Sequence, residues 1–155
     1  MRYARRVFSP ADFDLFQSRF QADPEWNGRR LELRRRLQEF GDRARVALLP
    51  ATGMDLERRE SLHHPHASNG MRVARQRTML FRGKQERKAL QKFVGPELAK
   101  DLDSAHRSVH FQIVVEERRA IWGLRWEKDA WFDLNVLVKR AEEGEGRSAL
   151  LQACA

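Results

Sequence analysis

The sequence of 155 residues has a single cysteine, Cys154, and no Cys-x-x-Cys pair. A disulfide within the chain is therefore excluded, and so is the paired-cysteine spacing of structural zinc sites. No apolar run approaches the roughly 20 residues of a membrane-spanning helix. The first residues lack the apolar core of about 7–15 residues that signal peptides carry. We expect a cytoplasmic protein that does not associate with membranes.

Motifs for catalysis are also lacking. Phosphate-cradling loops of the Gly-x-x-x-x-Gly-Lys or Gly-x-Gly-x-x-Gly kind are absent, which excludes a P-loop nucleotide hydrolase. The chain has no His-Glu-x-x-His helix, and no serine lies between the elbow glycines of hydrolases. We therefore predict no catalytic residue and no cofactor, and we favour a non-enzymatic protein.

Charge is abundant and unevenly placed. The sequence has 30 Lys and Arg and 22 Asp and Glu, which gives a net charge of +8. Residues 1–92 carry a net +10, whereas residues 93–155 carry a net −2. Arginine outnumbers lysine 24 to 6, which GC-rich codon usage can produce without selection for function. The position of the basic residues is therefore more informative than their total.

The first half of the chain has helical periodicity. Ser9, Pro10 and Asp12 form a capping sequence, and the apolar spacing that follows predicts a helix ending before 22–24. A second helix is predicted from Trp26 to near Pro50. Its apolar stripe keeps phase across Gly41, and its other face carries arginines, among them Arg29, Arg30, Arg34, Arg35, Arg36, Arg43 and Arg45.

Two hairpins are predicted further along the chain. Residues 55–62 and 71–81 flank a loop with Asn69-Gly70, and the period-two pattern of 108–116 pairs with 120–127. Helical spacing over 84–102 separates them, divided at Gly95-Pro96, and a last helix capped by Asp129 fades at 142–146. We expect a single α+β domain over residues 1–155, an antiparallel sheet of two hairpins with helices on one face.

Several short strings resemble a known family. They are Phe8-Ser9-Pro10-Ala11-Asp12-Phe13-Asp14-Leu15-Phe16 at the first helix, Thr52-Gly53-Met54 after the second, and His110-Phe111-Gln112-Ile113 in the main strand. Together they resemble the YktB-like family of small bacterial proteins. That family's Lys-Arg-Gly-Tyr-Lys-Lys stretch before the main strand has no counterpart here, where residues 83–108 add a helical segment. The resemblance implies a compact α+β fold and no activity, because the family has no settled function.

Histidines suggest one possible site. His63, His64 and His66 lie in a turn-rich loop, where two of them could share a metal ion. A metal-dependent hydrolase or nuclease that uses the His63-His64-Pro65-His66 loop is therefore one alternative, and an exposed polar loop is the other. His110 falls opposite Phe111 in the alternation, so we expect it to face solvent, a helix cap or a pocket.

A basic segment suggests a second site. Residues 71–92 carry eight basic side chains and one acidic one. The basic residues are Arg72, Arg75, Arg77, Arg82, Lys84, Arg87, Lys88 and Lys92. One guanidinium group can donate two parallel hydrogen bonds to the oxygens of one phosphate. This strand-and-helix surface is therefore predicted to contact a nucleic-acid backbone. An acidic protein partner and a merely solvated face remain the alternatives.

Overall fold

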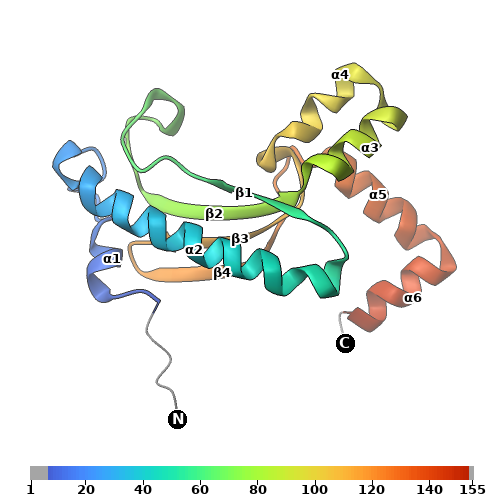
Figure 1. Cartoon of the computed structure of the whole chain (residues 1–155), viewed down its shortest axis with the longest axis horizontal. Helices are drawn as coiled ribbons and strands as arrows, with labels where there is room; N and C mark the ends of the chain where they lie inside the picture. The colour runs from blue at the N-terminus through green and yellow to red at the C-terminus, as the bar shows by residue number, and fades with distance from the viewer. Residues whose placement is uncertain (1–6, 154–155) are drawn as a thin grey trace, which may run out of the picture.

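The computed structural model describes residues 7–153, in which a four-stranded sheet carries a long helix across one face and further helices beyond one end (Figure 1). The strands are β1 (Leu56–Glu60), β2 (Arg75–Arg82), β3 (His110–Glu116) and β4 (Arg119–Arg125). The helices are α1 (Pro10–Asp14), α2 (Asn27–Thr52), α3 (Lys84–Val94), α4 (Pro96–Ala99), α5 (Trp131–Glu142) and α6 (Gly144–Ala153). Cys154 lies outside the described residues. None of the helices within 7–153 is long and apolar enough to cross a bilayer.

The sheet is an antiparallel meander in the order β1-β2-β3-β4. Both predicted hairpins are present, and the pairing of β2 with β3 joins them, with Thr78 opposite Ile113. The α+β class is therefore confirmed. Because side chains alternate across a strand, the register assigns each strand residue to one of two faces.

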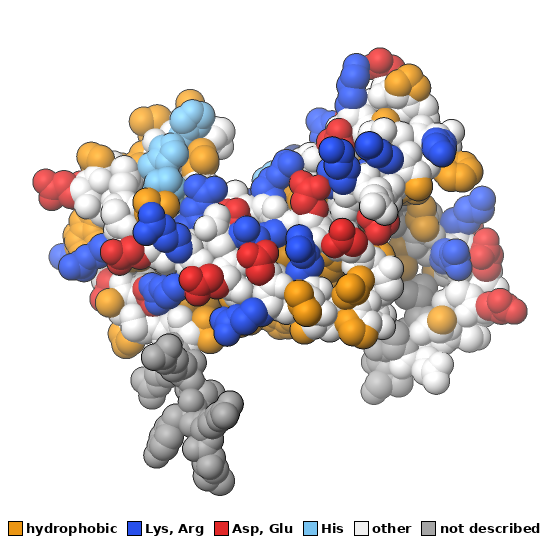
Figure 2. Space-filling view, viewed as in Figure 1, with side chains coloured by type: hydrophobic (Ala, Val, Ile, Leu, Met, Phe, Trp, Pro, Cys, Tyr) orange, Lys and Arg blue, Asp and Glu red, His pale blue; other side chains and the backbone are white. Residues whose placement is uncertain are grey.

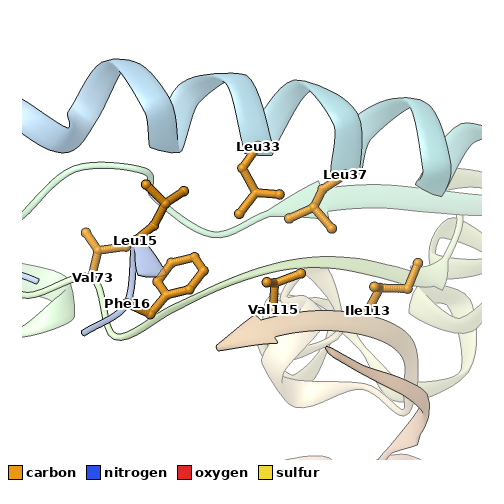
Figure 3. Packing of buried hydrophobic residues seen from close by; sticks show 7 residues of the cluster. All are labelled: Leu15, Phe16, Leu33, Leu37, Val73, Ile113 and Val115. Carbon is orange, nitrogen blue, oxygen red and sulfur yellow. The ribbon is translucent and has the colours of Figure 1, made fainter. Parts of the chain in front are cut away.

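Helix α2 covers one of these faces. Its buried Leu33 and Leu37 pack with Ile113 and Val115 of β3, as Figure 3 shows. Nearer its end, Ala44 joins Leu56 and Leu80 in a second buried cluster. The helix runs unbroken through Gly41, as predicted, and ends at Gly53, whose positive φ of 63° suits a residue without a Cβ.

The N-terminal segment differs from its prediction. Helix α1 ends at Asp14, and the chain continues in turns whose N–H groups bond three residues back, such as Phe16 to Phe13. Two arginines of α2 account for this arrangement. Arg36 pairs with the buried carboxylate of Asp12, and Arg30, expected on the charged outer face, is fully buried and donates to backbone carbonyl groups of the turns.

The opposite face of the sheet is covered only at one end. Met79 and Phe81 of β2 are buried there against Ala105, in the segment that links α4 to β3. Gly95, with a φ of 80°, separates α3 from α4 as the sequence predicted. The rest of this face carries Val114, Ile121 and otherwise polar side chains, and none of the helices within residues 7–153 covers it.

The C-terminal helices also differ from their prediction. Ala130, and not Asp129, precedes α5, and it makes no capping side-chain bond. The sequence pattern fades where α6 begins, yet α5 and α6 form a helical hairpin beyond the end of the sheet (Figure 1). The carboxylate of Asp133 fastens α5 to the sheet by pairing with Arg82 and accepting a hydrogen bond from the Val109 N–H.

A close approach of α2 to the sheet gives a stability prediction. A Cβ at Gly41 would lie 2.8 Å from the Arg58 Cδ and 2.9 Å from the Thr78 Oγ1, whereas one at Gly28, in the same helix, would meet nothing within 4 Å. We expect Gly41→Val to lower the free energy of unfolding by about 1–3 kcal/mol through overpacking. Gly28→Val is the matched control and should change it by less than about 0.5 kcal/mol. Urea denaturation measures both, and equal effects would contradict the close approach.

Candidate nucleic-acid interface

The uncovered face of the sheet is rich in arginine. Strand alternation brings Arg59 of β1, Arg75 and Arg77 of β2, and Arg119 and Arg125 of β4 to this face. Arg72, in the loop that leads into β2, lines the same hollow as Arg59, Arg75 and Arg77. We call these six residues the arginine face. Residues that are up to 66 positions apart thus contribute to one surface.

Two adjoining hollows run along the arginine face. The larger, of about 570 Å³, is lined by four arginines and one glutamate, with Ser61, Ser68 and Asn69 beside them. The second, of about 410 Å³, lies across β2, β3 and β4 and shares Arg75, Arg77 and His106 with the first. Together they form a trough whose lining also includes apolar side chains and, in the second hollow, the carboxylates of Glu116, Glu127 and Asp129. Figure 2 views the molecule from the side of α2, where Lys and Arg side chains alternate with Asp and Glu, so the trough lies on the far side of the sheet in that view.

Three arginines of this face have no carboxylate partner. Within residues 7–153, Arg59, Arg72 and Arg75 make no ion pair. The Arg59 guanidinium instead lies over the Phe81 ring, 5.4 Å from its centroid. Glu60, next to Arg59 in sequence, directs its carboxylate to the other face, where it pairs with Arg58 and Arg34. Glu116 lies opposite Arg75 in the strand register, and its carboxylate pairs with Arg119. These three guanidinium groups are therefore free to bind an anion.

Glu127 organises the rest of the trough. Its two oxygens lie 3.3 Å from the Arg77 Nη1 and 3.4 Å from the Arg125 Nη2. Burial raises the pKa of Glu127, but hydrogen bonds and charges from Arg125 and Arg77 outweigh it and hold that pKa below its ordinary value. Desolvation and the neighbouring Arg77 lower the pKa of His106, whose Nδ1 lies 3.1 Å from the Arg77 Nη2. A neutral His106 thus accepts a hydrogen bond from Arg77 and orients it.

Two predicted binding residues are structural instead. Arg82 falls on the face covered by α2, where it pairs with Asp133. Arg87 is buried, and its guanidinium binds Glu57 at 2.8 Å, Asp103 at 3.0 Å and the Arg82 carbonyl at 2.8 Å. The prediction grouped them with their neighbours in sequence, but strand alternation and the helix turn direct them inward.

The lysines of α3 stay at the surface. Lys84 and Lys88 line a smaller hollow together with Arg59, so they extend the arginine face toward α3. Lys92 is exposed near the end of the same helix and lines none of these hollows. Of the eight predicted residues, the structure therefore brings Arg72, Arg75, Arg77, Lys84 and Lys88 close to one surface.

The histidine loop stands at the edge of the sheet. The rings of His63 and His64 are 4.8 Å apart, and those of His64 and His66 are 6.2 Å apart, each pair edge to face. His63 contacts the Arg34 Nη1 through its Nδ1 at 3.2 Å, and His66 contacts the Ser68 Oγ at 2.9 Å. Within residues 7–153, no group of three or more His, Cys, Asp and Glu is placed to hold a metal ion. The metal-site prediction thus has no geometric support among these residues.

Sequence reasoning missed Arg59, Arg119, Arg125 and His106. The signal for the strand residues was present in the alternation, because Arg119 and Arg125 fall out of phase with the apolar Trp122 and Leu124 of the same strand. A pairing register would have placed them beside Arg75 and Arg77. His106 lies in a single helical turn between elements, a position that no periodicity could indicate.

The comparisons with known proteins found no match to a family model, to a curated protein sequence or to a solved structure. The resemblance to the YktB-like family therefore stays a prediction.

The buried Arg87 gives a prediction that separates structural from surface charge. Hydrogen bonds to charged groups contribute about 1.5–3 kcal/mol, so we expect Arg87→Ala to lower the free energy of unfolding by about 2 kcal/mol. Lys88→Ala removes the same charge from the next residue, which is exposed, and should change it by less than about 0.5 kcal/mol. Urea denaturation decides between them, and an Arg87→Ala protein as stable as Lys88→Ala would show that the buried contacts contribute nothing.

Buried His110 gives a prediction on pH. It is 1% exposed, which rules out the solvent-facing alternative, and its Nδ1 lies 3.0 Å from the Ser108 carbonyl oxygen. Burial lowers its pKa from the ordinary 6.5, and the pKa values of His63 and His106 are lowered too. The unfolded chain then binds more protons than the native one just below pH 6.5, so stability is lost as pH falls through that value.

The measurement is urea denaturation at pH 7.5 and pH 5.5. We expect a lower free energy of unfolding at pH 5.5, and a smaller loss in His110→Gln than in the wild-type protein. His66→Gln controls for the removal of an imidazole from an exposed position. An undiminished loss in His110→Gln would contradict the assignment.

Proposed function

We propose that the protein is a non-enzymatic module that binds the phosphate backbone of nucleic acid through the arginine face. The observation that carries this proposal is the set of three arginines without carboxylate partners, Arg59, Arg72 and Arg75, around one hollow. A guanidinium group presents two parallel N–H donors to phosphate oxygens, and it stays charged at any physiological pH.

The shape of the site favours a linear polyanion over a single small ligand. The two hollows are open and adjoining, and they share Arg75, Arg77 and His106. Lys84 and Lys88 prolong the positive surface beyond the sheet. Such a trough can contact several successive phosphates at once, which gives affinity that falls steeply as salt rises.

The chemistry of the trough favours contacts to phosphates over contacts to bases. Apart from His106, its lining residues within 7–153 include no aromatic side chain on which a base could stack. Phe81, the aromatic residue of β2 on this face, is buried beneath Arg59. We therefore propose binding that depends little on sequence, inside the cytoplasm of a bacterial cell and within a larger assembly.

Removal of two free arginines tests the proposal. Fluorescence anisotropy measures binding of a labelled random 20-base-pair duplex at salt concentrations from 50 to 200 mM. Each lost phosphate contact should reduce the slope of log affinity against log salt by about 1, so Arg72→Ala with Arg75→Ala should reduce it by about 2. The affinity at 50 mM salt should fall at least ~tenfold.

The control has the same change in net charge. Arg35→Ala with Arg43→Ala removes two exposed arginines from α2, far from the trough in the fold, and should leave the slope unchanged. Equal losses in the two double variants would mean that only net charge matters, and absent binding at 50 mM salt would overturn the proposal. Equally tight binding of polyglutamate would favour an acidic protein partner instead.

A further inference from the structure

A separate hollow lies on the side of the sheet opposite to the arginine face, between the end of the sheet and the α5–α6 hairpin. It has a volume of about 450 Å³, within the roughly 300–1,000 Å³ of small-molecule sites. Leu80, Phe111 and Leu124 of the sheet line one side, and Val136 and Leu137 of α5 line the other. We call it the α5 cleft.

The apolar lining of the α5 cleft is open to solvent. Leu124 is 51% exposed, and Trp126 and Val136 are each 45% exposed. Large apolar side chains gathered in one hollow are typical of a binding site, because their exposure to water is unfavourable. An occupant with an apolar body would cover them.

The polar groups of the cleft define the other end of that occupant. Arg82 and Arg140 line it, together with a single carboxylate, that of Asp133. Both Asp133 oxygens are already engaged, one by Arg82 and one by the Val109 N–H at 2.7 Å. The Arg82 Nη1 is buried and has no hydrogen-bond partner within residues 7–153. The two arginines and the one carboxylate leave this end of the cleft with an excess of one positive charge, which suits a ligand with one negative charge.

We propose that the α5 cleft binds an amphipathic monocarboxylate, with its carboxylate on Arg82 and Arg140 and its alkyl chain between the sheet and α5. A cation would meet two arginines, and an uncharged apolar ligand would leave the Arg82 Nη1 unsatisfied. A polyanion would meet the carboxylate of Asp133 at the point where it needs further positive charge. This site shares no residue with the arginine face, so it stands apart from the proposed function.

Calorimetric titration of the full chain with decanoate tests the proposal, and decan-1-ol is the uncharged probe of equal chain length. We expect saturable decanoate binding with one site per chain, and weaker binding of the alcohol. Val136→Glu places a negative charge in the cleft and should weaken decanoate binding at least ~tenfold. Leu134→Glu makes the same kind of change on α5 at a residue that is 49% exposed and outside the cleft lining, and it should have less than a twofold effect.

A second variant tests the carboxylate contact. Arg82→Lys keeps the positive charge beside Asp133 but removes the free Nη1 group. It should therefore weaken the binding of decanoate and leave the binding of decan-1-ol unchanged. Thermal melts verify that each variant is folded. The proposal is overturned by absent decanoate binding, by equal losses in Val136→Glu and Leu134→Glu, or by equal affinity for acid and alcohol. It is also overturned if sedimentation shows a dimer that Val136→Glu dissociates, because the cleft would then be an interface between copies.

Discussion

The packing of α2 on the sheet is the contact on which the rest of the structure depends. Leu33, Leu37 and Ala44 are buried against alternate residues of the strands, and Gly41 lets the helix approach β1 and β2 closely. Since every strand places successive side chains on opposite sides, this contact also decides which residues remain outside. Arg75 and Arg77 face away from α2 because the residues between and after them, Gln76 and Thr78, face toward it.

The same division separates structural from available charge. Arg30 and Arg87 are buried, and their guanidinium groups donate hydrogen bonds to carbonyl groups or carboxylates inside the fold. The guanidinium groups of Arg59, Arg72 and Arg75 remain available to solvent or to a ligand. Net charge alone treats these two groups alike, although only the second can contribute to binding. The local excess of positive charge in residues 71–92 therefore overstates the charge available at the surface there, and it leaves out the arginines that β1 and β4 add.

The sequence predicted the elements with strong periodicity and missed those defined by tertiary contacts. Period two in β3 and the long apolar stripe of α2 are local signals, and both elements are present. The shortness of α1 depends on Arg30, which binds carbonyl groups of the following turns from another helix, so no pattern within residues 9–22 could reveal it. The surface formed by Arg59, Arg75 and Arg119 likewise depends on strand register, which becomes known only when pairing partners are assigned.

Strand β2 connects the two proposed sites without sharing side chains between them. Arg75 and Arg77 point into the trough, whereas Arg82, shifted by an odd number of positions, points into the α5 cleft. A phosphate backbone and a carboxylate would therefore not compete for one guanidinium group. Both ligands would nevertheless bind only the folded sheet, so each would stabilise the same native state by mass action. Coupling between the sites beyond that effect would require two arrangements of β2, and its central place between β1 and β3 opposes such a change.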